Sequence, residues 1–201
     1  MVAELVGRPF DPLVEFDGMW DMKLAEHYLP LPHVPAAKYE CLDGKLIMSP
    51  YEASQNSYAE AQLAFLFHLA AKGTPFRVYG TVNLLFAPGR WIQPDLTVLN
   101  GSAEGALWVP PGLATMVAEV VSPSSRRRDR IDKPALCADA GIPFYLEVQV
   151  DHEQERAAVH LFKLDRGAYR PHSSALAGQK FETDLPFPLS FDPAELLDLD
   201  D

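Results

Sequence analysis

Two acidic residues lie in short apolar runs that predict β-strands. Asp95 opens the run at residues 94–99, and Glu119 lies within residues 115–123. β-Branched and aliphatic residues fill both runs, and Pro, Gly and Ser bound them, as is typical of strands. If the two strands pair antiparallel, the end that carries Asp95 is adjacent to the end that carries Glu119. Two carboxylates that converge in this way could hold one hard cation close to a substrate phosphate.

Glu119 and Asp95 differ in how strongly the local pattern supports a functional role. The run around Glu119 is apolar on both faces, which predicts a central strand that is buried on both sides. An ionised glutamate there is costly to desolvate unless a cation or a hydrogen-bond donor meets it, and buried acids are almost always paired. Asp95 follows a proline at a strand start, which is common turn chemistry, so a structural role for Asp95 is the alternative.

Composition indicates one ordinary globular domain. The chain has 201 residues, of which 48% are hydrophobic and 10% aromatic, enough for one substantial core and short for two. No apolar run approaches the length of a membrane span, and the N-terminus has acids where a signal peptide needs a basic flank. We therefore expect a cytoplasmic protein that does not engage a membrane. Cys41 and Cys137 have no CxxC partner, which argues against disulfides and structural zinc.

Net charge restricts how the chain could bind nucleic acid. The 17 Lys and Arg residues against 28 Asp and Glu residues give −11, so the average field repels a polyanion. A binder of this composition must concentrate positive charge locally or use a metal. Residues 126–133 do concentrate it, and phosphate contacts would form there; a solvated loop and helix start is the alternative. The basic residues of this run are Arg126, Arg127, Arg128, Arg130 and Lys133.

The elements that must position these residues alternate between helices and strands. A short helix is expected over residues 19–29 and the longest helix over 52–72, where an apolar stripe recurs at helical spacing. A third helix is expected over 132–140. Residues 100–113 are rich in Gly and Pro and predict a flap or a long loop. Strands are expected at 76–79, 82–86, 144–150, 157–164 and from 169, and from 174 we expect an irregular tail apart from a helix at 192–197.

Asp43 and Gly44 stand between two apolar runs, which is the strongest local signal for a hairpin. A two-residue turn would pair Leu42 with Lys45 and Glu40 with Ile47. Glu40 then lies on the more polar face, and this pattern favours a solvated or salt-bridged residue over a catalytic one.

Several common catalytic motifs are absent. The sequence has no glycine-rich phosphate loop, GxSxG elbow, HExxH motif or dinucleotide fingerprint. Hydride transfer and nucleotide hydrolysis therefore lack their usual signature, and no nucleotide cofactor is expected.

Four stretches together resemble the Uma-type putative restriction endonuclease family of the PD-(D/E)XK nuclease superfamily. They occur in the expected order, and the resemblance covers most of residues 20–197, with the middle two stretches the most specific. The stretches are YECLDGKLIMSP at 39–50, QPDLTVL at 93–99, VAEVVSPSSRRRDRIDK at 117–133 and AGIPFYLEV at 140–148.

The resemblance implies a mixed α/β fold with a restriction-endonuclease-like central mixed sheet, flanking helices and an added N-terminal β-hairpin. We find no internal repeat and no second domain. The expected organisation is an N-terminal arm at 1–18, a single domain at 19–197 and an acidic tail at 198–201.

The resemblance also implies divalent-metal-dependent hydrolysis of DNA phosphodiester bonds. By position, Asp95 and Glu119 match the family's ligands for Mg²⁺ or Mn²⁺, and Glu40 matches a recurrent family acid that would support them. The superfamily lysine normally lies two residues after the second acid, where this chain has Val121. Lys133 matches a family lysine in the following helix, although Pro134 biases the residue before it away from helical geometry.

Two other classes of function stay open. The net charge of −11 and Val121 at the usual lysine position favour a catalytically inactive nuclease-fold protein that binds or regulates. A metal-dependent hydrolase of small phosphorylated substrates would tolerate the acidic surface better than a DNA enzyme would. For a DNA endonuclease we expect a homodimer, because cutting both strands needs two sites or two visits.

Overall fold

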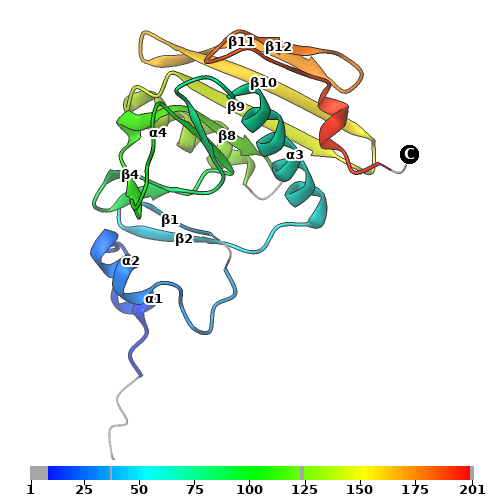
Figure 1. The fold of residues 1–201 in the computed structure, drawn as a ribbon. Coiled ribbons are helices and arrows are strands. Elements are labelled where there is room, and N and C mark those ends of the chain that lie inside the picture. Colours follow the sequence, from blue (N-terminus) through cyan, green and yellow to red (C-terminus); the bar gives the residue numbers. More distant parts are fainter. Residues whose placement is uncertain (1–8, 37, 123–124, 200–201) are drawn as a thin grey trace, which may run out of the picture. The chain divides into compact units, whose positions relative to one another are not determined.

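A computed structural model describes residues 9–36, 38–122 and 125–199 (Figure 1). Its backbone contacts divide the chain into two compact units, Met1–Tyr51 with Ala87–Trp91, and Glu52–Phe86 with Ile92–Asp201. The single domain over 19–197 stays a prediction, and residues 1–8 of the predicted arm and 200–201 of the predicted acidic tail lie outside the described residues. Among the described residues, no helix combines the length and the apolar character needed to cross a bilayer.

The first unit begins with two short helices. The helix α1 spans Pro12–Glu15, within the predicted arm, and α2 spans Met22–Tyr28. The carboxylate of Asp21 accepts a hydrogen bond from Leu24 N at 2.9 Å and caps α2, so this helix begins three residues later than predicted. Phe16 packs edge-on against Trp20 at a ring-centroid distance of 5.9 Å, which connects the segment around α1 to the rest of the unit.

The predicted hairpin forms with the predicted register. The strands β1 (Lys38–Leu42) and β2 (Lys45–Ser49) pair antiparallel, with Glu40 opposite Ile47 and Leu42 opposite Lys45. Asp43 and Gly44 have φ angles of 54° and 80°, which the type I′ turn requires at both central positions. The strand β5 (Arg90–Ile92) pairs with β1 through Cys41 and Trp91.

The second unit contains a mixed sheet of six strands in the part of the chain that the structure describes. Its order is β11-β10-β9-β8-β6-β3, in which β8 and β9 are parallel and the other neighbours are antiparallel. The bounds are β3 (Arg77–Tyr79), β6 (Leu96–Leu99), β8 (Ala114–Val120), β9 (Phe144–Asp151), β10 (Arg156–Asp165) and β11 (Ala168–Leu176). A mixed sheet is what the fold class predicts.

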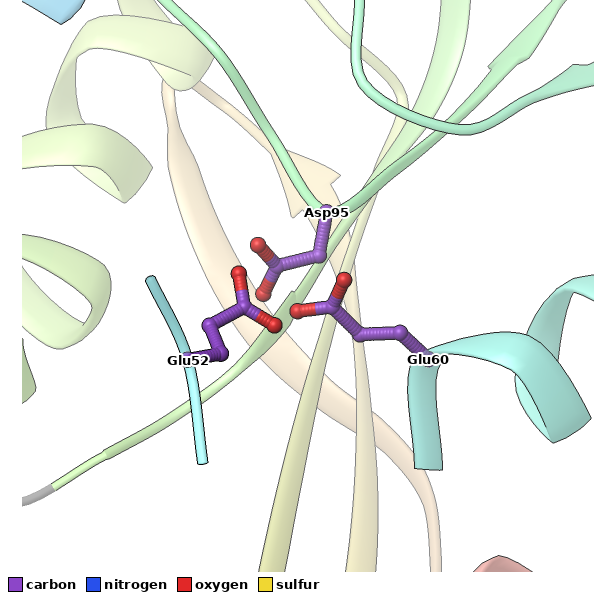
Figure 2. A group of neighbouring side chains, drawn as sticks. All are labelled: Glu52, Glu60 and Asp95. Atoms are coloured by element: carbon purple, nitrogen blue, oxygen red, sulfur yellow. The ribbon is translucent and has the colours of Figure 1, made fainter. Parts of the chain in front are cut away.

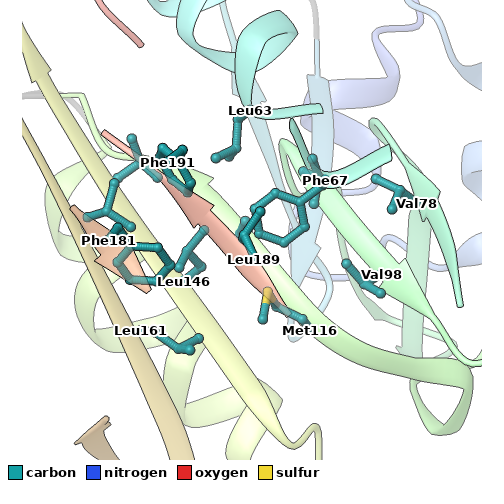
Figure 3. Close-up of a cluster of buried hydrophobic side chains, with 14 of the residues drawn as sticks. Leu63, Phe67, Val78, Val98, Met116, Leu146, Leu161, Phe181, Leu189 and Phe191 are labelled. Atoms are coloured by element: carbon teal, nitrogen blue, oxygen red, sulfur yellow. The ribbon is translucent and has the colours of Figure 1, made fainter. Parts of the chain in front are cut away.

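One face of this sheet packs against α3 (Ser54–Ala70), the longest helix, as expected from its apolar stripe. Phe67 and Leu63 of α3 are fully buried and belong to the same cluster as Met116 of β8 (Figure 3). Successive residues of a strand point to opposite faces. Because Met116, Ala118 and Val120 face this core, Glu119 is directed to the opposite face of the sheet.

The C-terminal region is more ordered than predicted. In place of an irregular tail it forms β12 (Phe181–Thr183) and β13 (Leu189–Phe191), which pair antiparallel, and a 3₁₀ turn at Pro193–Leu196. The two strands are three residues long, too short for a readable period. Burial of Phe181 and Phe191 in the core stabilises them instead. The 3₁₀ turn stands in place of the helix predicted at 192–197, and Asp192 caps it by accepting a hydrogen bond from Ala194 N at 2.8 Å.

Between these elements lie shorter segments. The strands β4 (Asn83–Ala87) and β7 (Trp108–Val109) pair in parallel, and a 3₁₀ turn at Pro111–Leu113 leads into β8. The connection at 100–113 therefore contains local structure, although its sequence predicts only a flap or loop.

A π-helical turn at Arg128–Asp132 leads directly into α4 (Lys133–Asp139). Lys133 has φ −66° and ψ −46°, so it is helical, and the expectation that Pro134 would divert it is wrong. Pro134 occupies the first turn of α4, where a missing N–H costs little.

Candidate active site

Asp95 and Glu119 lie at adjacent strand ends, as the sequence predicts. The strands β6 and β8 pair antiparallel with Leu96 opposite Ala118, which places the residue before Leu96 beside Glu119. A carboxylate oxygen of Asp95 (Oδ2) accepts a hydrogen bond from the backbone N–H of Val120 at 2.6 Å. This bond fixes the orientation of the Asp95 carboxylate at the end of β8.

Glu119 contacts a buried lysine from the following helix. The distance from Lys133 Nζ to Glu119 Oε1 is 2.9 Å, and that from Lys133 Nζ to Asp129 Oδ1 is 3.2 Å. Glu119, Asp129 and Lys133 are 1%, 2% and 5% exposed. Two carboxylates and one ammonium group therefore share a site with little solvent, where charges interact strongly and persist only when they are paired.

Two neutral side chains, those of Tyr145 and Cys137, lie close to these three charged groups. The Tyr145 hydroxyl donates a hydrogen bond to the backbone oxygen of Asp129 at 2.7 Å. Burial, and then the negative charge of Glu119, raise the pKa of Tyr145 well above its usual value. The same two causes raise the pKa of the Cys137 thiol. Both groups therefore stay protonated near neutral pH, and Tyr145 acts here as a hydrogen-bond donor.

The structure brings two further acids to Asp95 that the sequence analysis missed. Glu52 precedes α3, and Glu60 lies in its second turn (Figure 2). Each of Glu52, Glu60 and Asp95 offers one carboxylate oxygen, and these oxygens lie within 4.8 Å of one another. The sequence signal is slight: Glu60 directly follows Ala59, a fully buried residue of the α3 stripe. Only the packing of α3 against the sheet brings Glu60 to Asp95.

These acids fit a divalent cation. Carboxylate oxygens are the ligands that Mg²⁺ and Mn²⁺ prefer. Glu52 is exposed, while Glu60 and Asp95 are half-buried, so solvent and substrate could reach the group. Asp95 belongs both to this group and to the strand end that carries Glu119, since it also bonds Val120. Asp95 is thus shared by the group with Glu52 and Glu60 and by the strand end that carries Glu119.

The basic run separates into residues in different environments. Arg126 and Arg127 are exposed, and Arg128 is half-buried. Arg127 Nε lies 3.9 Å from Asp132 Oδ2, a loose contact on a side chain that is 84% exposed. Arg130 is held firmly: its Nε and Nη2 atoms lie 3.0 Å and 2.7 Å from Glu147 Oε1.

Glu147, the partner of Arg130, lies opposite Glu119 in the parallel pairing of β8 with β9. The two acids therefore occupy neighbouring positions on the same face of the sheet. Glu147 is buried and also accepts a hydrogen bond from Gln149 Nε2 at 2.7 Å. This pairing places the Arg130 guanidinium group beside Glu147, the strand neighbour of Glu119.

Glu40 lies in β1, within the first unit, and is 3% exposed. The local pattern favours a solvated or salt-bridged residue, and this burial contradicts only the first of these two alternatives. Its burial is unusual for a glutamate and is consistent with a specific role for this side chain.

A central mixed sheet, flanking helices and an N-terminal β-hairpin define the restriction-endonuclease-like class of nuclease folds. The sequence profile of the Uma2 family, described as "Putative restriction endonuclease", matches residues 25–199. The chain therefore belongs to the Uma2 family.

A solved structure supports the same fold. The crystal structure of a putative nuclease belonging to DUF820 from Anabaena variabilis superimposes with a TM-score of 0.58. The two chains are 16% identical, and the match covers 85% of this chain and 95% of the other. At this identity the likeness concerns the fold. No curated protein matches the chain.

Proposed function

We propose that this protein is a divalent-metal-dependent endonuclease that hydrolyses DNA phosphodiester bonds. One observation carries the proposal: a buried lysine lies 2.9 Å from Glu119, at the strand end where Asp95 is fixed by the Val120 N–H. Two acids that can hold a metal ion, together with a lysine that can stabilise negative charge, are groups that can catalyse phosphodiester hydrolysis. Membership of the Uma2 family supports the same activity.

In this proposal Asp95 and Glu119 are metal ligands, and Glu52 and Glu60 supply further oxygens beside Asp95. Bound Mg²⁺ or Mn²⁺ would polarise the scissile phosphate and lower the pKa of the attacking water. The Lys133 ammonium, held by Glu119, would stabilise negative charge that develops on the phosphate. Glu40 is the proposed supporting acid.

The basic run is the proposed nucleic-acid contact. Arg126 and Arg127 are exposed and could reach the DNA backbone. Arg130 is directed by Glu147, and Arg128 completes the local positive charge that a chain of net charge −11 needs to approach a polyanion. A homodimer in the cytoplasm is the proposed assembly and location.

Calorimetric titration of Mg²⁺ and Mn²⁺ tests the metal site. Binding to the wild type should be lost or strongly weakened in Asp95→Asn and in Glu119→Gln. Glu60→Gln and Glu52→Gln should weaken binding if these acids share the ion. Glu104→Gln, at an exposed acid in a loop, is the control and should bind as the wild type does. Unchanged binding in Asp95→Asn would overturn the assignment.

Cleavage of supercoiled plasmid with Mg²⁺ or Mn²⁺ then separates the three classes of function. Cleavage by the wild type that is lost in Asp95→Asn, and strongly reduced but still measurable in Lys133→Met, supports the endonuclease. Metal binding with hydrolysis of small phosphate esters, and no cleavage of DNA, would support a small-substrate hydrolase. DNA binding without metal affinity or cleavage would support the inactive nuclease-fold binding protein.

A further inference from the structure

We propose that Asp129 is a positioning residue, which holds the Lys133 ammonium in place beside Glu119. This inference rests on the proposed role of Lys133 in catalysis. No motif in the sequence analysis singles out Asp129, which lies inside the basic run between Arg128 and Arg130. Its side chain nevertheless lies in the buried site and not with the exposed arginines.

The ammonium group of Lys133 lies between two buried carboxylates from different elements. Glu119 Oε1, from β8, is 2.9 Å from Lys133 Nζ, and Asp129 Oδ1, from the π-helical turn, is 3.2 Å from it. Asp129 is 2% exposed. A carboxylate this deeply buried is costly to desolvate, and the contact with Lys133 offsets part of that cost.

The backbone of Asp129 is anchored on both sides of its Cα atom. Its N–H donates a hydrogen bond to Ser125 O at 3.0 Å, and its carbonyl accepts one from the Tyr145 hydroxyl at 2.7 Å. Tyr145 is itself buried in β9, a central strand of the sheet. Asp129 is therefore a rigid point from which a carboxylate can direct a flexible neighbour.

Lysine needs such a second contact because its four-carbon stem has many rotamers. A single contact with Glu119 fixes one direction only. Glu119 is also a proposed metal ligand, so its carboxylate would interact both with the metal ion and with the Lys133 ammonium group. Asp129 gives Lys133 a second carboxylate, one that lies outside the Glu52, Glu60 and Asp95 group.

The first test needs no enzymatic activity. In ¹⁵N-labelled protein, lysine-selective NMR should show a slowly exchanging ammonium signal for Lys133, identified by its absence in Lys133→Arg. Asp129→Asn should broaden or remove that signal. The matched control is Asp132→Asn, which alters another acid of the same π-helical turn, one with a side chain that is 35% exposed. An unchanged Lys133 signal in Asp129→Asn would overturn the proposal.

The second test is a double-mutant comparison of DNA cleavage at saturating metal. Asp129→Asn should lower kcat by about 10- to 100-fold, the usual effect of removing a supporting contact, with KM for DNA and metal affinity nearly unchanged. In a Lys133→Met background the same change should have little further effect, because a positioning residue acts through its partner. Asp132→Asn should cleave as the wild type does.

The outcomes separate this proposal from the proposed function. If the wild type cleaves DNA and the kcat losses of Asp129→Asn and Lys133→Met multiply in the double mutant, Asp129 acts independently of Lys133 and the positioning role is wrong. If the wild type does not cleave, the endonuclease assignment fails, and the NMR comparison still decides whether Asp129 holds Lys133.

Discussion

Lys133 Nζ lies 2.9 Å from Glu119 Oε1, and both side chains are almost completely buried. The contact joins the N-terminus of α4 to the central strand β8, so it connects the basic segment to the sheet. Its chemical role is proposed above, and its physical consequence is a strong dependence of folding stability on the lysine charge.

Lys133→Met should lower the free energy of unfolding by about 3–5 kcal/mol, the usual cost of removing one partner from a buried ion pair. The change leaves the buried carboxylates of Glu119 and Asp129 without the positive charge of the Lys133 ammonium group, which contacts both. Urea unfolding followed by circular dichroism measures the effect. Lys180→Met is the control, since Lys180 pairs with Glu182 on the surface and should change stability by less than about 0.5 kcal/mol. Equal stability of the two variants would contradict the prediction.

The core beneath α3 offers a matched pair of phenylalanines. Phe67 is fully buried and Phe65, two residues earlier in the same helix, is 60% exposed. Phe67→Ala should cost about 3–5 kcal/mol through lost burial and the cavity left behind. Phe65→Ala should cost less than about 1 kcal/mol, because little apolar surface is buried there. Similar losses in both variants would mean that α3 packs with a different face.

The arginine run should make DNA binding depend on salt. Replacing both Arg126 and Arg127 with alanine should reduce the slope of log K against log salt concentration by about 2, roughly 1 for each lost phosphate contact, with little change in stability. Fluorescence anisotropy with duplex DNA between low and moderate salt measures the slope. Arg170→Ala, at an exposed arginine on β11, is the control. A slope that stays at the wild-type value would remove these residues from the interface.

Arg130→Ala should behave differently from the exposed pair. It leaves the buried carboxylate of Glu147 without the Nε and Nη2 donors of Arg130. We therefore expect a loss of folding stability of about 1–3 kcal/mol in addition to weaker DNA binding. Parallel urea and anisotropy measurements on Arg130→Ala separate the two effects.

The fold should lose stability in alkali. Burial raises the pKa of the Cys41 thiol to about 11, from 9.0 in an exposed thiol. The folded state therefore keeps a proton that the unfolded chain releases, and this contribution to stability is full below pH 9 and falls as the pH rises toward 11. Unfolding free energies at pH 8, 9, 10 and 11 should fall less steeply in Cys41→Ala. An identical pH dependence in the two proteins would show that Cys41 does not contribute.

Local sequence was sufficient wherever a nearby signal decides the structure. Asp43 and Gly44 provide the two positive φ angles that set the hairpin register. The stripe that includes Leu63 and Phe67 marks the buried face of α3. Asp95 and Glu119 could be paired in advance because two short runs with one acid each leave few antiparallel registers. Resemblance to a family, rather than the local pattern, was needed to select Lys133.

Only the tertiary structure decided which distant side chains meet. Glu60 reaches Asp95 because α3 packs across the sheet, Asp129 lies against Lys133 through the π-helical turn, and Arg130 pairs with Glu147 of β9. The strands β12 and β13 form because their aromatic residues are buried by elements far along the chain. These contacts depend on strand order and helix packing, which result from the free energy of the whole core and leave no periodic signal in any one segment.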